Sequence, residues 1–375
     1  MTDAADVLIL GGGVIGLTTA WFAAEAGARV ALVDQRDLGQ QASWAGAGIL
    51  APADRAHART PYERLHAHSV ALYPDLSQKL REQTGIDNGY RVCGGLELFL
   101  DSGETSSDEW RGEGVDCREY KKDELHRVCP YLAPSVERAV FLPGMAQVRN
   151  PRHLQALKAA CAALGVRLLP HCTVDRLIRT GNRIEAVETP QGRLTAARYL
   201  IAAGAWSEAL LQPLGFRPGI KPIRGQIALL NFGASAAWPL LLRGKRYLVP
   251  RGDGRVLVGS TEEDAGFAPV TTASAIADLL TFATSLVPEL ARAEVERCWA
   301  GLRPGSPDGK PFLGVVPGVD NLFVAAGHFR AGLQLSPATA SVMKELLLDE
   351  KPTIALDDFR LDRPTAPPAQ AAFRS

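Results

Sequence analysis

The sequence predicts an α/β protein, α+β overall, in which a Rossmann-like nucleotide-binding domain is interleaved with an antiparallel-sheet domain. Three observations carry this prediction. Residues 6–34 follow a strand–glycine turn–helix–strand pattern. Residues 220–301 read as strands followed by one helix, and residues 322–348 return to a strand and a helix. Two α/β segments therefore flank a β-rich one, which indicates interleaved rather than consecutive domains.

The N-terminal glycine turn predicts a pyrophosphate site. After an apolar strand, Gly11 lets the chain turn sharply, Gly13 leaves room for a pyrophosphate, and Gly16 lets the next helix pack closely. The free N–H groups and dipole at the start of that helix favour negative charge. Asp34 closes the second strand, where a carboxylate can accept hydrogen bonds from a ribose. The turn predicts a dinucleotide but leaves NAD and FAD both open.

Composition excludes several classes of function. The chain has 375 residues, enough for about two domains. Its 46% hydrophobic and 22% charged residues are ordinary for a globular protein, and 41 basic residues balance 41 acidic ones. Nothing therefore points to nucleic acid or an anionic membrane as a partner. The apolar stretch 7–24 follows Asp3 and Asp6 instead of a basic segment, so we expect neither a signal peptide nor stable membrane insertion. We expect a cytoplasmic protein.

No metal site is expected. The six cysteines are widely scattered without a CxxC pair, which favours reduced, mostly buried thiols over zinc ligands. His66 and His68 are two residues apart, a spacing that does not align them on a helix, and a solvated face accounts for them.

The remaining elements follow from local patterns. Asn150 is expected to cap a helix that has Pro151 in its first turn and ends at Gly165. The other expected helices cover residues 53–80, 273–286 and 337–348, and the expected strands cover 94–100, 166–169, 173–178, 199–203, 226–230, 246–249, 256–260 and 322–326. Glycine-containing turns at 181–182 and 191–192 indicate hairpins. Residues 101–113 read as a polar loop.

Five separated motifs resemble one enzyme family. They are residues 11–16, 42–48, 203–207, 299–311 and 326–334, which include Gly-Gly-Gly-Val-Ile-Gly, Ala-Gly-Leu-Arg-Pro-Gly and Gly-His-Phe-Arg-Ala-Gly. Together they resemble the FAD-dependent D-amino acid oxidase superfamily, and within it most closely the glycine oxidase family associated with making the thiazole of thiamine. The resemblance extends from about residue 5 to about residue 362.

The resemblance implies non-covalently bound FAD. Val14 and Ile15 would face the pyrophosphate, Asp34 and Gln35 the adenosine ribose, and the Val174 backbone the adenine. The glycine turn, the path to the flavin and the loop around the isoalloxazine complete the expected cofactor site: Gly11, Gly13, Gly16; Ala42, Ser43, Ala47, Gly48, Ile49; His328, Phe329, Arg330, Ala331, Gly332, Leu333 and Gln334. Related sarcosine oxidases attach their flavin to a cysteine within the segment matching residues 300–305, which here contains none.

The resemblance also implies a small amino acid or amine substrate held by its carboxylate. Arg303 is the first candidate because a guanidinium matches a carboxylate in bidentate geometry. Tyr247 and Arg330 match the family residues that complete the substrate's polar end. Each residue alone has an ordinary structural interpretation, a surface ion pair for an arginine and half-buried packing for a strand tyrosine.

The implied reaction is hydride transfer from the substrate Cα to flavin N5. For glycine the imine product hydrolyses to glyoxylate and ammonia, and O2 is reduced to hydrogen peroxide. A quinone-dependent D-amino acid dehydrogenase and a non-catalytic NAD-binding module are the alternatives. Assembly into a homo-oligomer is left open.

The resemblance predicts how the domains divide. Residues 1–85, 146–219 and 304–364 would form the FAD-binding domain, 86–145 and 220–303 the substrate-binding domain, and 365–375 a flexible tail.

Four cations, Arg55, His57, Arg59 and His66, fall where the family has a mobile segment over the site. A solvated helical face accounts for them. The alternative is that one reaches a substrate side chain and extends the range to acidic or larger D-amino acids.

Overall fold

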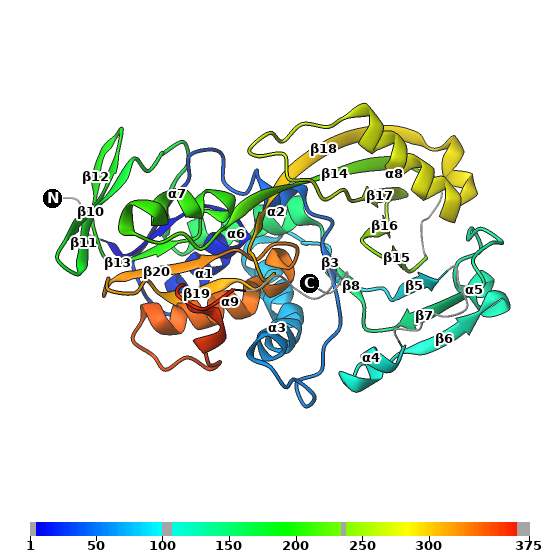
Figure 1. Ribbon diagram of the computed structural model, residues 1–375, viewed down its shortest axis with the longest axis horizontal. Helices are drawn as coiled ribbons and strands as arrows, with labels where there is room; N and C mark the ends of the chain where they lie inside the picture. Colours follow the sequence, from blue (N-terminus) through cyan, green and yellow to red (C-terminus); the bar gives the residue numbers. More distant parts are fainter. Residues whose placement is uncertain (1–4, 100–106, 234–237, 366–375) are drawn as a thin grey trace.

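A six-stranded sheet forms one half of the molecule (Figure 1). The computed structural model describes residues 5–99, 107–233 and 238–365. The sheet has the order β19-β20-β13-β1-β2-β9, and every pair is parallel except β19–β20. Its strands are β1 (Ala5–Leu10), β2 (Val30–Val33), β9 (Arg167–Leu169), β13 (Ala196–Ile201), β19 (Phe312–Val315) and β20 (Leu322–Ala326). This arrangement confirms the Rossmann-like α/β prediction.

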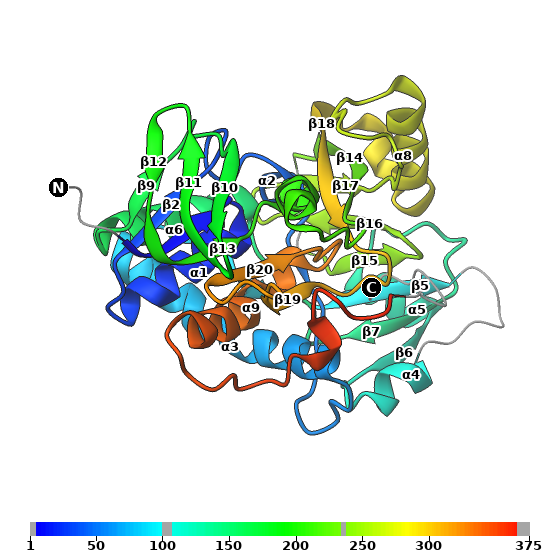
Figure 2. The same ribbon diagram turned by 60° about the vertical axis from the view of Figure 1, so that its left-hand side comes forward.

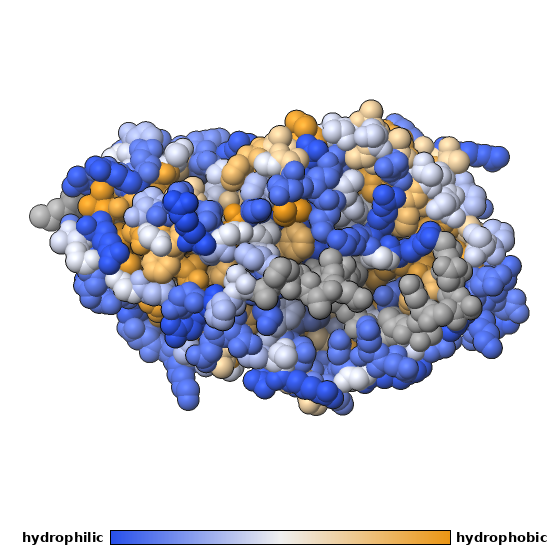
Figure 3. Space-filling model, viewed as in Figure 1, coloured by the Kyte–Doolittle hydropathy of each residue, from blue (hydrophilic) through white to orange (hydrophobic). Residues whose placement is uncertain are grey.

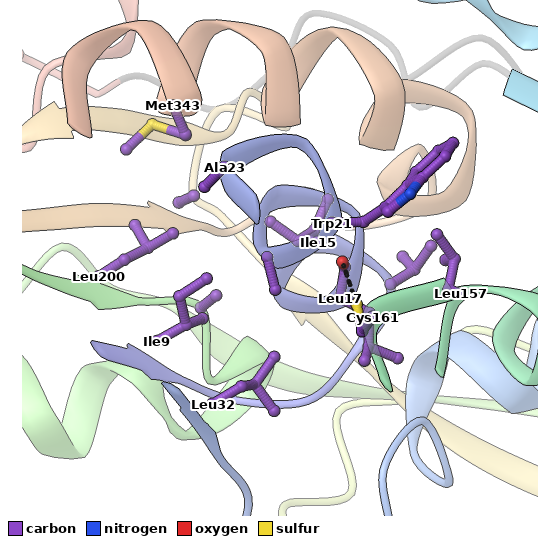
Figure 4. Packing of buried hydrophobic residues seen from close by; sticks show 14 of the residues in the cluster. Ile9, Ile15, Leu17, Trp21, Ala23, Leu32, Leu157, Cys161, Leu200 and Met343 are labelled. Carbon is purple, nitrogen blue, oxygen red and sulfur yellow. Dashed lines mark hydrogen bonds between the residues drawn. The ribbon is translucent and has the colours of Figure 1, made fainter. Parts of the chain in front are cut away.

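Both faces of this sheet are buried, which explains the continuous apolar runs of its strands. One face, with Ile9, Leu32 and Leu200, packs under helices (Figure 4). These helices are α1 (Val14–Glu25), α3 (Pro61–Thr84), α6 (Asn150–Ala163) and α9 (Gly332–Leu347). On the other face, Leu8 and Ile201 pack in a core shared with a three-stranded sheet (Figure 2). That sheet is β10 (Arg176–Thr180), β11 (Arg183–Thr189) and β12 (Gly192–Leu194).

The second large sheet has eight strands in the order β18-β14-β17-β16-β15-β5-β7-β6. They are β5 (Gly95–Phe99), β6 (Arg118–Lys121), β7 (Arg138–Leu142), β14 (Lys221–Asn231), β15 (Leu240–Arg243), β16 (Arg246–Pro250), β17 (Arg255–Gly259) and β18 (Glu294–Gly305). The sheet is antiparallel as predicted except for the parallel pair β5–β15. Helix α8 (Ala273–Leu286) packs on one face through Leu279 and Leu286. Tyr247 belongs to the core on the opposite face.

Short elements join these parts. A small antiparallel sheet contains β3 (Ile49–Leu50), β4 (Arg91–Val92) and β8 (Ala146–Gln147). The short helices are α2 (Ala42–Ala45), α4 (Ser107–Gly112), α5 (Lys122–Val128) and α7 (Ser207–Leu211), with 3-10 turns η1 (Gly204–Trp206), η2 (Gln212–Leu214), η3 (Pro288–Arg292) and η4 (Asp357–Phe359). In Figure 1 the paired strands β14 and β18 reach from the eight-stranded sheet toward the other half.

Two helix starts differ from the sequence prediction. Helix α3 begins at Pro61, not near residue 53, because Thr60 and Glu63 form a capping box. Helix α9 begins at Gly332, so Pro337 lies inside it rather than at its start. Pro337 has no N–H for the Leu333 carbonyl four residues earlier. That carbonyl accepts hydrogen bonds from the Tyr73 and Ser336 hydroxyls instead, and the helix continues through the proline.

Two other segments also differ. Residues 107–112 of the expected polar loop form α4, whose Trp110 is buried, while residues 101–106 lie outside the described part of the chain. The strand expected at 173–178 is shifted to Arg176–Thr180. The expected tail also lies outside the described residues apart from residue 365.

The described residues form no large apolar area on the face that Figure 3 shows, and the six cysteines among them form no disulfide. The face in Figure 3 is mostly hydrophilic, with small separate apolar areas. All six cysteines are free, and Cys129, Cys161 and Cys172 are buried. Within the described ranges, no helix is long and apolar enough to cross a membrane. Nor do three His, Cys, Asp or Glu side chains gather there as a metal site needs.

Removing the Arg363 side chain should destabilise the fold strongly. Its guanidinium bonds both Asp308 oxygens at 2.9 Å and lies 3.9 Å from the Phe312 ring centroid. The two ionic side chains are only 7% and 13% exposed. Breaking one partner of a buried pair costs about 3–5 kcal/mol, so Arg363→Ala should lower the free energy of unfolding in urea by that amount. The control Arg360→Ala removes an exposed pair with Asp362 and should change nothing measurable. Equal effects would contradict this account.

Candidate active site

One elongated cavity of about 520 Å³ lies between the two halves. It is lined by the glycine turn after β1, the segment around α2, the ends of β16 and β18, and the loop before α9. Every residue expected at the cofactor or the substrate lines it except Gly16. Gly16 lies behind the lining, where a Cβ would overlap the Gly11 carbonyl oxygen. It therefore serves the packing of α1 against β1.

The glycine turn brings bare backbone to the cavity. Gly11 has φ +119°, and a Cβ there would overlap the Ala202 carbonyl. Helix α1 starts after Gly13, with no acidic residue in its first turn. The Val14 N–H donates to Ser43 Oγ at 2.9 Å. Because the helix start carries partial positive charge, this end of the cavity favours an anion.

Asp34 lies beside that turn and is already hydrogen-bonded. Its carboxylate accepts from the Gly12 N–H at 2.7 Å and the Arg36 N–H at 2.9 Å. Burial raises the pKa of Asp34, and these two hydrogen bonds oppose the rise. The carboxylate is thus held in a fixed orientation at the end of β2, and both Asp34 and Gln35 line the cavity.

Asn150 has a different role from the predicted helix cap. Helix α6 has no side-chain cap, and the Asn150 amide donates to the Ser43 carbonyl at 2.7 Å instead. Its Oδ1 is buried without a partner, and the residue lines the cavity. Asn150 thereby fixes α2 next to the glycine turn. Sequence reasoning missed this because an Asn-Pro pair is read first as a helix start.

Arg251 is a second residue that the sequence did not single out. It is 4% exposed and donates to the Ala47 carbonyl at 2.7 Å and to Gln147 Oε1 at 2.6 Å. Burial lowers its pKa to about 9. Its hydrogen bonds attach the Ala47–Ile49 lining to the β16–β17 hairpin, and therefore to the other half of the molecule.

Arg303 and Tyr247 lie over glycines. The Arg303 guanidinium occupies the space that a Cβ on Gly225 would fill, and the Tyr247 ring does the same at Gly259. Arg303 donates to the Thr261 carbonyl at 3.0 Å and to Ser260 Oγ at 2.6 Å. Neither of these two acceptors carries a charge, so these hydrogen bonds do not neutralise the guanidinium.

Arg330 is the second guanidinium at this end. It donates to the Lys245 carbonyl at 3.1 Å, and its Nε lies 3.7 Å from Glu262 Oε2. Burial and the charge of Arg303 lower the pKa of Arg330. Its Nη1 is buried with no hydrogen-bond partner. Two cations this close favour an anionic ligand.

The loop before α9 is tied to the end of β18. Phe329 has φ +46°, an uncommon conformation for a non-glycine residue, and its N–H donates to the Pro304 carbonyl at 2.9 Å. The backbone of His328 forms an isolated antiparallel β-bridge with Gly305, and its Nε2 lies 3.1 Å from Thr339 Oγ1. Burial lowers the pKa of His328 to about 3, so its imidazole is neutral at pH 7.

The solvated-face interpretation of the four cations is wrong for His66. Its imidazole lines the cavity and contacts the Ala51 carbonyl and Gln334. Arg55, His57 and Arg59 are exposed, lie in the loop before α3 rather than on a helix, and do not line the cavity. The structure adds unpredicted lining residues beside His66, from α3 and the region of α4: Tyr62, Glu63, Trp110 and Glu113.

His66→Gln should weaken the dependence of stability on acid. Burial lowers the pKa of His66 from 6.5 to about 4. Between these values the unfolded chain binds a proton that the folded chain does not, so stability falls as the pH falls through this window. The substitution should reduce the slope of the unfolding free energy against pH by up to about 1.4 kcal/mol per pH unit.

Urea unfolding at pH 4.5, 5.5 and 6.5 measures this slope. His171→Asn, which removes an exposed imidazole where φ is +55°, is the control. An unchanged slope in His66→Gln would mean that the buried imidazole accepts a proton as readily as the unfolded chain does.

Comparisons with known proteins agree on one family. The FAD dependent oxidoreductase family model matches residues 6–346. Glycine oxidase of Pseudomonas aeruginosa is 38% identical over 350 residues, 93% of this chain and 96% of that protein. The bifunctional protein ThiO/ThiG of a Synechocystis strain is 35% identical over 97% of this chain, which spans 54% of that protein. The crystal structure of glycine oxidase from Geobacillus kaustophilus has a TM-score of 0.92 and 32% identity, covering 97% of this chain and all of that one.

Proposed function

Because the chain belongs to the family of FAD dependent oxidoreductases, we propose that it oxidises glycine and other small amino acids or amines, with O2 as the electron acceptor. The products are the 2-oxo acid, ammonia and hydrogen peroxide. The observation that carries the proposal is the pair of guanidinium groups, Arg303 and Arg330, at one end of a cavity whose other end is a nucleotide-type glycine turn. Two guanidinium groups beside a tyrosine hydroxyl suit one small carboxylate.

The other end of the cavity fits FAD. A Cβ on Gly11 would overlap the neighbouring backbone, and the α1 start has no acid to compete with a pyrophosphate. We assign the pyrophosphate to Val14 and Ile15, the ribose to Asp34 and Gln35, and the adenine to the backbone of Val174. The residues around α2 would then flank the path to the flavin, and the loop from His328 to Gln334 would surround the isoalloxazine.

FAD would be held without a covalent bond. No cysteine occurs in the segment 300–305. Cys298 packs against the core that contains α8, and burial raises the pKa of its thiol. A protonated thiol in that position is not poised for attachment.

The reaction would depend mainly on orientation. Bound FAD supplies a two-electron acceptor, which lets an amine lose a hydride from its Cα. Arg303 and Arg330 would bind the substrate carboxylate, and the Tyr247 hydroxyl would donate a further hydrogen bond to it. The N–H groups in the first turn of α9 favour negative charge beside the loop. His66 and His328 are neutral at pH 7, so neither imidazole adds charge to the site.

The division into interleaved domains remains part of the proposal. The six-stranded sheet draws its strands from the segments 1–85, 146–219 and 304–364, which supports assigning these segments to the FAD-binding domain. The eight-stranded sheet uses 86–145 and 220–303, apart from the last residues of β18. Six free thiols are consistent with a reducing compartment such as the cytoplasm.

A place in making the thiazole of thiamine is supported by the likeness to the Synechocystis ThiO/ThiG protein. The similarity to proteins named oxidases favours O2 over a quinone as the acceptor.

Anaerobic mixing tests cofactor, reaction and substrate together. Purified protein should be yellow, and glycine, sarcosine or D-alanine should bleach its flavin absorption without O2. Admitting air should restore the colour and release hydrogen peroxide. Bleaching that persists in air until a quinone is added would favour the dehydrogenase. Colourless protein that does not take up FAD would contradict the proposal.

Arg303→Ala should separate substrate binding from cofactor binding. Removing a charge-assisted carboxylate contact worth about 1.5–3 kcal/mol should lower kcat/KM for glycine roughly ten- to hundredfold. The FAD content measured by absorbance should not change. Arg255→Ala removes a guanidinium from β17 of the same sheet, where it pairs with Glu296, and is the matched control. Wild-type kinetics in Arg303→Ala would remove the carboxylate role from this residue.

A further inference from the structure

The Glu262 carboxylate lies next to the Arg330 guanidinium, outside the lining of the cavity. Glu262 Oε2 lies 3.7 Å from Arg330 Nε, and Oε1 lies 2.9 Å from Lys245 Nζ. The Lys245 backbone carbonyl in turn accepts a hydrogen bond from Arg330 Nη2. Three residues therefore form a closed frame that fixes the orientation of Arg330.

The frame is buried on its Arg330 side and exposed on its Lys245 side. The Arg330 side chain is 10% exposed and that of Lys245 is 43% exposed. Glu262 Oε2 and Arg330 Nη1 are both buried and lack a hydrogen-bond partner. Burial acts to raise the pKa of Glu262, but the hydrogen bond from Lys245 and the charges of Arg330, Lys245 and Arg303 together hold it below its usual value, so this group is ionised at pH 7.

We propose that Glu262 is a specificity-determining residue that restricts the enzyme to substrates with one carboxylate and disfavours those with two. The inference rests on the proposed function. It concerns charge behind the site rather than contact with substrate, because Glu262 itself does not line the cavity.

Counting charges shows why. Arg303 and Arg330 contribute two positive charges, and Glu262 removes one of them. One substrate carboxylate then nearly neutralises the site, since the Lys245 side chain is 43% exposed and its charge is partly screened by water. A second carboxylate would leave a surplus negative charge in a site of low effective dielectric.

Nothing else along the described lining offsets that surplus. The lining arginines are Arg303 and Arg330, and the lining histidines, His66 and His328, have pKa values of about 4 and about 3. The acids Glu63 and Glu113 also line the cavity and add negative charge. Glu263, next in sequence to Glu262, is paired with Arg224 and belongs to a separate cluster.

Matched substrate pairs measure this selectivity. Sarcosine and iminodiacetate differ by one carboxylate on the N-substituent, and D-alanine and D-aspartate differ by one on the side chain. For each pair, the ratio of kcat/KM for the dicarboxylate to kcat/KM for the monocarboxylate cancels general effects on folding and FAD loading.

Glu262→Gln should raise these ratios about tenfold, because removing one negative charge near the site favours the substrate that carries one more carboxylate. Glu262→Asp keeps the charge and should restore the wild-type ratios. Lys245→Met keeps the backbone carbonyl that accepts the Arg330 hydrogen bond. It removes the ammonium that partly neutralises the Glu262 carboxylate, so it should lower the ratios. Because Lys245 is exposed, that decrease should shrink in 0.5 M NaCl.

The outcomes are distinguishable. Equal ratios in the wild type, Glu262→Gln and Lys245→Met, with active flavoenzymes, would overturn the inference and leave the proposed function intact. A wild-type protein that oxidises none of these four amines would overturn the proposed function itself. If Glu262→Gln fails to fold, the opposite shift and the salt dependence in Lys245→Met decide the matter.

Discussion

The antiparallel pairing of β14 with β18 is the constraint on which the rest of the structure depends. It extends from Lys221 opposite Gly305 to Asn231 opposite Glu294 and includes one irregularity in register. At its outer end the pair belongs to the eight-stranded sheet. At its inner end, Arg303 enters the cavity, Pro304 accepts the Phe329 N–H and Gly305 bridges to His328. One ladder therefore sets the distance between the carboxylate-binding end and the loop that leads into α9.

The two ends of the cavity use opposite means to bind charge. At the glycine turn the side chains are removed, so that backbone N–H groups and a helix dipole meet the ligand directly. At the far end charge is carried by guanidinium groups, and glycines on neighbouring strands make room for the large side chains of Arg303 and Tyr247. In both places glycine creates the space, but it admits a ligand at one end and a protein side chain at the other. Asn150 and Arg251 join the ends through the segment around α2.

Prediction from the sequence succeeded where a local pattern has one physical meaning. The N-terminal strand, turn and helix follow from apolar runs and glycine spacing, and α8 was placed at its observed bounds. It failed where a distant group changes that meaning. From the sequence, Pro337 predicts the start of a helix. In the structure the helix continues through Pro337, because the hydroxyl of Tyr73, far away in sequence, donates to the Leu333 carbonyl that the proline leaves without a partner. From the sequence, Asn150 predicts a helix cap, but in the structure its side chain donates to the Ser43 carbonyl instead.

The candidate site divides in the same way. Residues in motifs, such as Asp34 and Arg303, could be placed from the resemblance to a family, and the cavity brings them together. Glu262, Arg251 and Trp110 carry no motif, because their importance arises from neighbours on other strands and helices. His66 shows the limit most clearly. Its spacing from His68 suggests exposure, but the burial of its imidazole depends on Gln334 at the opposite end of the chain.

The order of strands in the six-stranded sheet has a consequence for biosynthesis. Strand β1 pairs with β13 nearly two hundred residues later, β13 pairs with β20, and the N-terminal helix α1 packs against α9. The strand partners of β1 and β2 have all been made by Ile201, but β13 waits for β20 and α1 waits for α9 until almost the whole chain has emerged. Long-range pairing of this kind slows folding and leaves one edge of β13 and the α9-facing surface of α1 uncovered in the meantime. The six-stranded sheet is therefore completed late in synthesis, and its apolar surface is open to aggregation until then.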